Sequence, residues 1–290
     1  MNAPSIVYLN GRFVPLAEAR ISILDRGFCY GDGLFETLRA YGGKVFKLGW
    51  HLDRLEESAK SIYLELPESK ESLTTVIHET LNKNDLTDAI IRLTVTRGES
   101  FPGLTIDESS NSTLVVYARP FKPVPEVWYR EGIKIALLPQ AAQKIAGVER
   151  QIKSLNYLSP IMSLKQAQDR GAVEAVMLDE SGRVCDGATS NIFIIQQGIL
   201  RTPAVNEYVL AGITRKAVLH LSHKLGMVCE EKDLSREDIY QAGEVFITNS
   251  GLEILPVTQV DDVTVGDGRP GPQTRKLHEN YLKWVDEDPS

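Results

Sequence analysis

The sequence predicts an α+β fold divided into two domains. Its expected strands and helices are grouped rather than strictly alternating along the 290 residues, which is typical of an α+β protein. The segment RPFKPVPEV, residues 119–127, carries three prolines within six positions, and proline forms an extended, stiff spacer. The chain is long enough for two cores. We therefore expect a small α+β domain over 1–120, a linker over 121–130 and a larger domain over 131–290.

Two β-hairpins are predicted at the start of the chain. In SIVYLNGRFVPL, Asn10-Gly11 separates two short apolar runs, and this dipeptide is the strongest short hairpin signal. In GDGLFETLRAYGGKVFKL, Gly42-Gly43 stands at the corresponding turn. The first domain therefore begins with paired strands.

Helices and further strands complete the first domain. From GWHLDRLEESAKSIYL onward the apolar period becomes helical. Its apolar stripe comprises Leu52, Leu55, Ala59 and Ile62. Residues 69–83 predict a second helix, and AIIRLTVTRG and STLVVYARP predict two strands.

The second domain is expected to be mainly β with a few helices. GIKIALLPQ and EVFITNS predict strands, and AVEAVMLDESGRVCDGATSNIFIIQQGILRTP predicts several strands separated by turns. Ser159 and Pro160 can serve as the cap and first residue of a helix that ends at Gly171. TRKAVLHLSHKLGM and GPQTRKLHENYLKWV predict two more helices, the second of them terminal.

The composition of the chain argues against several classes of protein. The net charge of −7 argues against a nucleic-acid-binding protein, which needs a positive face for phosphates. The three cysteines, Cys29, Cys185 and Cys229, are widely spaced, which favours a reducing compartment. No basic segment precedes a long apolar run at the N-terminus, and no run approaches the roughly 20 residues that span a bilayer. We expect a cytoplasmic enzyme or binding protein.

Lys153 is the first candidate functional residue. It stands in VERQIKSLNYLSP between isoleucine and serine, just before an apolar, tyrosine-containing segment. Most lysines keep their charged end in water. A lysine held in a partly apolar pocket instead has a lowered pKa and can form a Schiff base with an aldehyde. The residues alone leave both interpretations open.

Three other features could belong to the same site. Asp186 lies between two β-rich segments, where a buried carboxylate needs a partner such as a protonated pyridine nitrogen; otherwise it is a turn aspartate. Residues 212–214 precede or open a helix, so their N–H groups could bind an anion, although Thr214 could be an ordinary N-cap. Residues 248–250 follow an apolar strand and suit either phosphate binding or a plain turn.

Other signatures are absent or weak. His220 and His223 are three residues apart on a predicted helix with no third ligand nearby, so we expect no metal site. GFCYGDG does not have the glycine spacing of a dinucleotide-binding loop, and the sequence contains no Gly-x-Ser-x-Gly nucleophile elbow.

Taken in order, six motifs resemble one enzyme family. They are YGDGLFETLRAY, HLDRLEESAK, IKSLNYL, GATSNIF, GITR and TNSGLEILPV. Their order and spacing resemble the fold-type-IV pyridoxal-phosphate enzymes over nearly the whole chain. That family includes branched-chain and D-amino-acid aminotransferases, some amine transaminases and aminodeoxychorismate lyase. The resemblance implies a small α+β domain, a larger β-barrel-like domain with helices, pyridoxal 5′-phosphate between them, and a homodimer whose partner chain helps close the substrate pocket.

The resemblance also implies the cofactor contacts. Lys153 would form the Schiff base with pyridoxal phosphate and act as the general base. Asp186 stands where the family usually has glutamate on the pyridine nitrogen; being one methylene shorter, it would need a closer cofactor or a bridging water. Tyr157 would lie near the phenolic oxygen of the cofactor. The phosphate contacts would be Arg54, Ile213, Thr214 and Ser250.

Substrate contacts follow from the same resemblance. Tyr30 and Arg39 would face the substrate, and Thr37 stands where branched-chain enzymes often have glycine and the lyases often have threonine. Arg97 precedes a segment that is a candidate to close the pocket, and Gly251 belongs to the loop on the other side of the substrate. TRGESFPGL lacks the arginine and histidine with which D-amino-acid aminotransferases hold the α-carboxylate.

We therefore expect a transaminase that moves an amino group between an amino acid or primary amine and a 2-oxo acid. The alternative within the family is aminodeoxychorismate lyase, which produces 4-aminobenzoate and pyruvate. An alternative of another class is a non-catalytic, anion-binding protein in which Lys153 and Asp186 only form an ion pair.

Overall fold

The chain forms two compact units. The computed structural model describes residues 5–100, 103–106, 111–139, 142 and 144–288. Unit 1 comprises residues 1–122, 152–156 and 288–290, and unit 2 comprises residues 123–151 and 157–287. Lys153 thus groups with the N-terminal unit, although it lies within the expected 131–290 domain. The domain limits at 120 and 131 stay a prediction.

Unit 1 is built on a six-stranded antiparallel sheet in the order β2-β1-β6-β5-β3-β4. Its strands are β1 (Ile6–Leu9), β2 (Arg12–Pro15), β3 (Gly33–Tyr41), β4 (Lys44–Val45), β5 (Ala89–Thr96) and β6 (Thr113–Pro120). Both predicted hairpins are confirmed. Asn10 and Gly11 have φ values of 46° and 87°, the left-handed pair that a tight two-residue turn requires.

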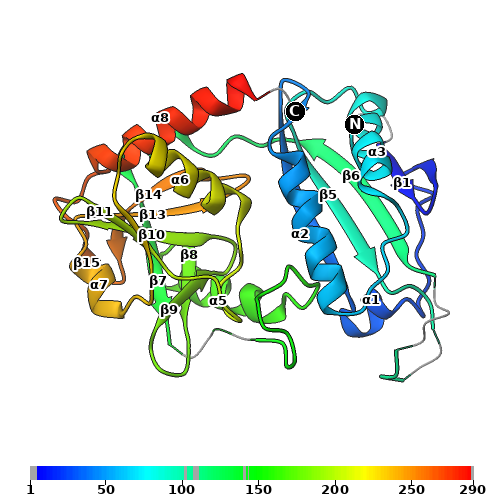
Figure 1. The fold of residues 1–290 in the computed structure, drawn as a ribbon, viewed down its shortest axis with the longest axis horizontal. Helices are drawn as coiled ribbons and strands as arrows, with labels where there is room; N and C mark the ends of the chain where they lie inside the picture. The colour runs from blue at the N-terminus through cyan, green and yellow to red at the C-terminus, as the bar shows by residue number, and fades with distance from the viewer. Residues whose placement is uncertain (1–4, 101–102, 107–110, 140–141, 143, 289–290) are drawn as a thin grey trace. The chain divides into compact units, whose positions relative to one another are not determined.

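Helices cover one face of this sheet. They are α2 (Leu48–Ser61) and α3 (Lys70–Lys83), and a short helix, α1 (Arg26–Tyr30), precedes β3. Helix α2 packs over β3. Helix α3 packs over β1 and β6 (Figure 1). Ser69 caps α3 by accepting a hydrogen bond from the Ser72 N–H at 3.2 Å. Helix α1 is not predicted by the sequence pattern, because a helix of five residues is too short to show a period.

Residues 152–156 join unit 1 by pairing with the start of β3. The N–H of Phe35 donates to the carbonyl of Lys153 at 2.9 Å, and the N–H of Leu155 donates to the carbonyl of Gly33 at 3.0 Å. Strand β4 pairs only with Ala40 and Tyr41, at the end of β3. Residues 152–156 therefore supply hydrogen-bond partners for backbone groups at the start of β3.

Unit 2 contains a nine-stranded mixed sheet. Its strands are β7 (Ile133–Leu138), β8 (Glu174–Leu178), β9 (Val184–Gly187), β10 (Asn191–Gln196), β11 (Ile199–Thr202), β12 (Cys229–Glu231), β13 (Glu244–Asn249), β14 (Glu253–Val260) and β15 (Val263–Thr264). The order is β12-β11-β10-β13-β14-β7-β8-β9, with β15 paired to β14. Strands β9 and β10 are distant in this order but lie close together, so the sheet curls towards a barrel.

Five helices surround the sheet in the described part of unit 2. They are α4 (Glu126–Glu131), α5 (Leu158–Asp169), α6 (Ile213–Lys224), α7 (Arg236–Tyr240) and α8 (Pro272–Glu287). Helices α6 and α8 pack on each other and on β13 (Figure 1). The predicted cap at Ser159 is wrong: the Ile161 N–H donates to the Tyr157 carbonyl at 3.0 Å, so the helix begins at Leu158. Gly171 follows its end with a φ of 72°.

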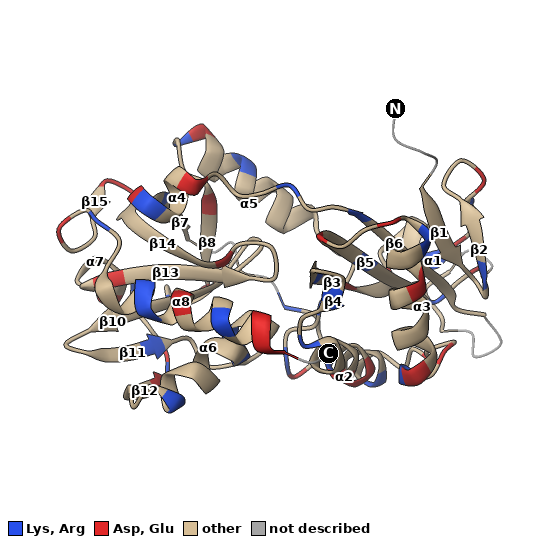
Figure 2. Cartoon of the chain, turned by 90° about the horizontal axis from the view of Figure 1, so that it is seen from above, with Lys and Arg blue, Asp and Glu red and all other residues tan. Residues whose placement is uncertain are grey.

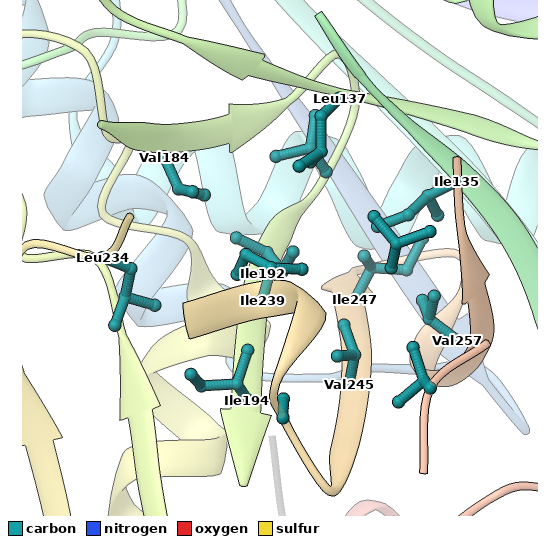
Figure 3. Close-up of a cluster of buried hydrophobic side chains, with 14 of the residues drawn as sticks. Ile135, Leu137, Val184, Ile192, Ile194, Leu234, Ile239, Val245, Ile247 and Val257 are labelled. Atoms are coloured by element: carbon teal, nitrogen blue, oxygen red, sulfur yellow. The ribbon is translucent and has the colours of Figure 1, made fainter. Parts of the chain in front are cut away.

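A large apolar core stabilises unit 2. Branched aliphatic side chains from most strands meet inside the curled sheet and pack closely (Figure 3). They include Ile135, Leu137, Val184, Ile192, Ile194, Leu234, Ile239, Val245, Ile247 and Val257. Burial of this surface is the main favourable term in folding the unit. Charged residues of both signs are instead spread along the helices and loops of each unit (Figure 2).

Candidate active site

A buried charge cluster connects β3 and α2 in unit 1. The Glu36 carboxylate contacts His51 Nδ1 at 2.7 Å, and it accepts hydrogen bonds from Arg54 Nε at 2.8 Å and from Arg54 Nη2 at 2.6 Å. Glu36 shares one face of β3 with Leu38 and Ala40, the face that α2 covers. His51 and Arg54 are three residues apart and share the facing side of α2.

The electrostatics of this cluster are set by burial and by Arg54. Burial by itself would raise the pKa of Glu36, but the Arg54 charge and the His51 hydrogen bond lower it to about 2. Burial lowers the pKa of His51; the Glu36 carboxylate opposes this, and the positive charges of Arg54 and Lys153 lower it further. At neutral pH the cluster therefore holds an ionised glutamate, a neutral imidazole that donates through Nδ1–H, and a guanidinium.

Lys153 lies beside this cluster. Its ammonium lies 4.5 Å from the centre of the Phe35 ring and close enough to His51 to affect the protonation of that imidazole. The side chain is half-buried, and the backbone of residues 152–156 is fixed to β3. The structure thus brings together two predicted site residues, Lys153 and Arg54, with Glu36 and His51, which the sequence analysis missed. A glutamate on an apolar strand face was the signal that could have found them.

Two other residues of unit 1 that are predicted to contact the substrate are partly accessible. Tyr30 ends α1 and is 40% exposed; its hydroxyl accepts a hydrogen bond from the Gly103 N–H at 3.2 Å. Thr37 lies on β3 opposite Arg92 of β5 and is half-buried. Residues 101–102 and 107–110 of the segment after Arg97 lie outside the described residues.

Two predicted arginines of unit 1 are engaged with protein groups. The buried guanidinium of Arg39 donates to Asp88 at 3.1 Å and to the carbonyl of Ala40, and it lies 3.6 Å from the centre of the Phe121 ring. Arg97 donates to both carboxylate oxygens of Asp32, at 2.9 and 3.1 Å. It also donates to the carbonyls of Ile62 and Tyr63 at 2.8 and 2.7 Å.

Asp186 is a buried carboxylate of unit 2. Its Oδ1 accepts from the Asn191 amide at 2.8 Å, and its Oδ2 accepts from the Leu210 N–H at 2.6 Å. Asn191 also donates to the Leu210 carbonyl at 2.9 Å, which ties the end of β9 to the residues before α6. Asp186 is therefore held by neutral donors and is not merely an exposed turn residue.

Helix α6 begins with an uncapped turn. Gly212 is the N-cap residue and has no side chain that could accept a hydrogen bond from the first N–H groups of the helix. A Cβ atom at Gly212 would lie 1.9 Å from Asn191 Oδ1, so only glycine fits this close approach. Ile213 and Thr214 are both buried. The helix start thus presents backbone donors and a positive dipole end, which is the arrangement that binds anions.

The turn between β13 and β14 carries Ser250 and Gly251. Asn249 Oδ1 accepts from the N–H groups of Gly251 at 2.9 Å and Leu252 at 2.7 Å, which fixes the turn. The hydroxyl of the preceding Thr248 is buried without a hydrogen-bond partner among the described residues. Tyr157, also in unit 2, precedes α5 and is half-buried.

The described residues contain no group of three or more His, Cys, Asp or Glu side chains placed to hold a metal ion. Among them, no helix is both long enough and apolar enough to cross a membrane.

Comparison of the chain with known proteins shows its family. The model of the family described as amino-transferase class IV matches residues 33–260. The chain belongs to the class IV aminotransferase family. Its relatives are aminotransferases, so this class IV aminotransferase is a transaminase, and the expected α+β, fold-type-IV architecture is confirmed.

Similar proteins cover almost the whole chain. A putative branched-chain-amino-acid aminotransferase of Methanocaldococcus jannaschii is 40% identical over 96% of this chain and 97% of its own length. A D-alanine aminotransferase of Listeria monocytogenes is 35% identical over 96% of each chain.

Solved structures agree with this assignment. The branched-chain amino acid aminotransferase of Escherichia coli has a TM-score of 0.93 and 29% identity, covering 98% of this chain and 95% of its own. Another branched-chain amino acid aminotransferase, also with a TM-score of 0.93, was solved with pyridoxamine 5′-phosphate. The 4-amino-4-deoxychorismate lyase of Pseudomonas aeruginosa has a TM-score of 0.83 and 28% identity, covering 97% and 99%.

Proposed function

We propose that this class IV aminotransferase uses pyridoxal 5′-phosphate bound through Lys153 and transfers the amino group of branched-chain L-amino acids to a 2-oxo acid. The observation that carries the proposal is the placement of Lys153. It is half-buried between an aromatic ring and a buried charge cluster, on a backbone segment fixed to β3. A lysine on such a rigid support is suited to covalent and acid–base chemistry.

The residues present fit the cofactor. Arg54 supplies a guanidinium beside Glu36 in unit 1, and the start of α6, which has no side-chain cap, supplies anion-binding N–H groups in unit 2. Asp186 supplies a buried carboxylate suited to a protonated ring nitrogen. The Thr248 hydroxyl, which has no partner among the described residues, marks an unused polar group just before Ser250.

Each residue has a defined task in the proposed reaction. Bound pyridoxal phosphate supplies an aldehyde carbon that takes up the amino group and a ring that withdraws electrons. Lys153 Nζ would be released when the amino group of the donor replaces it on that carbon, and the free amine would then accept the proton from the α-carbon of the donor. Asp186 would hold the proton on the ring nitrogen, and its two neutral donors would keep it in place. Tyr157 would contact the phenolic oxygen.

The phosphate group would be bound by charge and by backbone donors. Arg54 would contribute its guanidinium, which Glu36 orients through two hydrogen bonds. The N–H groups of Ile213 and Thr214 and the hydroxyl of Ser250 would complete the set.

Several residues are proposed to meet the substrate. Tyr30, Thr37 and Gly251 keep their predicted role. Arg39 and Arg97 also keep it, but each would have to exchange a protein acceptor for the substrate carboxylate. The branched-chain donor is favoured by the M. jannaschii and E. coli proteins and by the missing arginine–histidine pair in TRGESFPGL. The D-alanine aminotransferase relatives make D-alanine the second candidate donor.

We further propose a cytoplasmic homodimer. The three cysteines of the chain are widely spaced, and all three are free. Residues 16–30 of unit 1 expose several large apolar side chains, which typically marks an interaction surface. They are Leu16, Ile21, Ile23, Leu24, Phe28 and Tyr30.

The test is a spectrum of the holoenzyme with single additions of L-leucine, D-alanine, (R)-1-phenylethylamine or aminodeoxychorismate. Conversion of the cofactor to its pyridoxamine form by L-leucine supports the proposal. Conversion of the cofactor by D-alanine alone, or by the amine alone, would show that this compound is the donor and that L-leucine is not. Release of pyruvate from aminodeoxychorismate, with no conversion by the other three, would show the lyase instead.

Substitution of Lys153 tests the assigned residue. Lys153→Ala should lower turnover by at least about 10³-fold, because it removes both the covalent attachment and the base. Borohydride should label the wild-type protein at Lys153 and not the variant. Lys165→Ala, which removes an exposed lysine of α5, is the control and should behave as wild type. Normal turnover of Lys153→Ala would refute the assignment.

A further inference from the structure

A second cluster of side chains lies behind the Asn249–Glu253 turn in unit 2. It consists of His278 from α8, Glu253 from the first position of β14 and Tyr129 from α4. His278 Nε2 and Glu253 Oε2 are 2.8 Å apart, and both side chains are mostly buried, with 20% and 14% exposed. The imidazole stacks on the Tyr129 ring at 4.9 Å with an angle of 10° between the planes. The three side chains thus form one packed unit.

This cluster also contacts the backbone of the turn. The Tyr129 hydroxyl donates to the carbonyl of Leu252 at 3.0 Å. On the other side, Asn249 accepts from Gly251 and Leu252, and its Nδ2 donates to the carbonyl of Thr189 at 3.1 Å. The turn is therefore fixed by hydrogen bonds from both of its sides.

Glu253 has an unfavourable backbone conformation. Its φ is 56°, in the left-handed region that a residue with a Cβ atom rarely adopts outside asparagine and aspartate. Such a conformation persists where the surrounding contacts hold it. The pairing of the Glu253 carboxylate with His278 is a contact of this kind, and it acts on the residue that ends the turn.

We propose that His278 is a positioning residue for cofactor binding. By holding Glu253 in its left-handed conformation, it sets the path of the turn and so places the Ser250 hydroxyl against the cofactor phosphate. The inference rests on the proposed function, because Ser250 is assigned to the phosphate there. Through His278, the terminal helix α8 becomes part of the support of the phosphate site.

The experiment compares two ligands that differ only in the phosphate. Apoprotein is titrated with pyridoxal 5′-phosphate and, separately, with pyridoxal, and the absorbance change at Lys153 reports binding. His278→Ala should raise the Kd of pyridoxal phosphate about tenfold, as expected for loss of one well-placed charged hydrogen bond. The Kd of pyridoxal should change by less than about twofold, because pyridoxal does not use Ser250. His278→Gln, which keeps an N–H at similar reach, should restore most of the affinity for pyridoxal phosphate.

Matched variants separate positioning from a purely structural role. His220→Ala removes another imidazole that stacks on an aromatic ring, that of Trp284, at 4.8 Å, and it should leave both Kd values unchanged. Tyr129→Phe keeps the stack but removes the hydrogen bond to Leu252, so it should weaken binding of pyridoxal phosphate but not of pyridoxal. In a Glu253→Gly background, where glycine adopts a positive φ without strain, His278→Ala should have no further effect.

Three outcomes would overturn the inference. The first is a His278→Ala protein whose Kd for pyridoxal phosphate equals that of His220→Ala. The second is an equal loss of affinity for both ligands, which would indicate general damage rather than a displaced phosphate contact. The third is a full additional effect of His278→Ala in the Glu253→Gly background. If the wild-type protein binds neither ligand through Lys153, the proposed function itself fails, which is a different and recognisable result.

Discussion

Glu36 shows how one residue combines structure and candidate chemistry. Its carboxylate is fully buried, yet it stays ionised because Arg54 and His51 surround it. A buried carboxylate with two such partners fixes the orientation of Arg54, and so the direction in which the guanidinium can meet a phosphate.

Glu36 should make the stability of the protein depend on pH. Its pKa falls from 4.5 to about 2 on folding, so its contribution is complete above about 4.5 and is lost as the pH falls towards 2. Glu36→Gln should therefore lower the free energy of unfolding by about 3 kcal/mol at neutral pH, because it leaves Arg54 without its charged partner. The deficit should shrink at about pH 3, and urea unfolding at both pH values measures it.

Glu57→Gln is the control for this prediction, because Glu57 is an exposed carboxylate on α2. This substitution should lower the free energy of unfolding by less than about 0.5 kcal/mol at either pH. A deficit of Glu36→Gln that stays constant with pH would show that the lost contribution is packing rather than charge.

At the same scale, sequence reasoning found some candidate residues and missed others. Lys153 and Asp186 stand out because a charged residue next to apolar segments is unusual. Glu36 and His51 were missed, since nothing in FETLR or HLDRL shows that the two side chains face each other across a sheet and a helix. The roles of Lys153 and Asp186 stay predictions until they are tested.

Among the elements, α8 shows how a helix start is held by a distant strand. Glu244 of β13 accepts from the N–H groups of Gln273 and Thr274, at 3.1 and 2.8 Å, and from the Thr274 hydroxyl at 2.7 Å. These backbone donors lie in the first turn, where a helix supplies no acceptor, and a carboxylate also interacts favourably with the helix dipole. Glu244 thus fixes the helix that carries His278.

Removal of this contact should destabilise unit 2. Glu244→Ala is expected to lower the free energy of unfolding by about 2 kcal/mol, measured by urea denaturation, with Glu279→Ala on the exposed face of α8 as the control. In the wild type, a Cβ atom at Gly271 would lie 2.0 Å from Glu244 Cδ. Gly271→Ala should therefore lower the free energy of unfolding of the wild type, and it should lower that of the Glu244→Ala variant much less. Additive effects would contradict this interpretation.

Element prediction succeeded where the signal is local. The hairpins at Asn10-Gly11 and Gly42-Gly43 and the helix at 69–83 follow from turn chemistry and periodicity. The start of α5 was placed two residues late, because its first turn has no side-chain cap and Ser159-Pro160 looks like one. The short helices α4 and α7 were missed, since five or six residues do not establish a period.

For the whole molecule, the exposed apolar residues 16–30 carry the prediction of a homodimer. Phe28 is 69% exposed and Ile23 is 77% exposed, which is unfavourable for a monomer in water. Phe28→Asp should shift the protein towards a monomer in analytical ultracentrifugation, because it places a charge in the proposed interface. Val228→Asp changes a residue of unit 2 that is 60% exposed and should leave the mass of the assembly unchanged. A monomeric wild-type protein would refute the dimer.

The sequence by itself determined the fold class, the hairpins, the main helices and, through the order of its motifs, the enzyme family. These depend on neighbours within a few residues and on chemistry that single motifs carry. Only the tertiary structure decided that residues 152–156 complete the sheet of unit 1, that Glu36 meets His51 and Arg54, and that His278 holds Glu253. Each of those contacts joins residues far apart along the chain, where periodicity carries no information and packing chooses the partner.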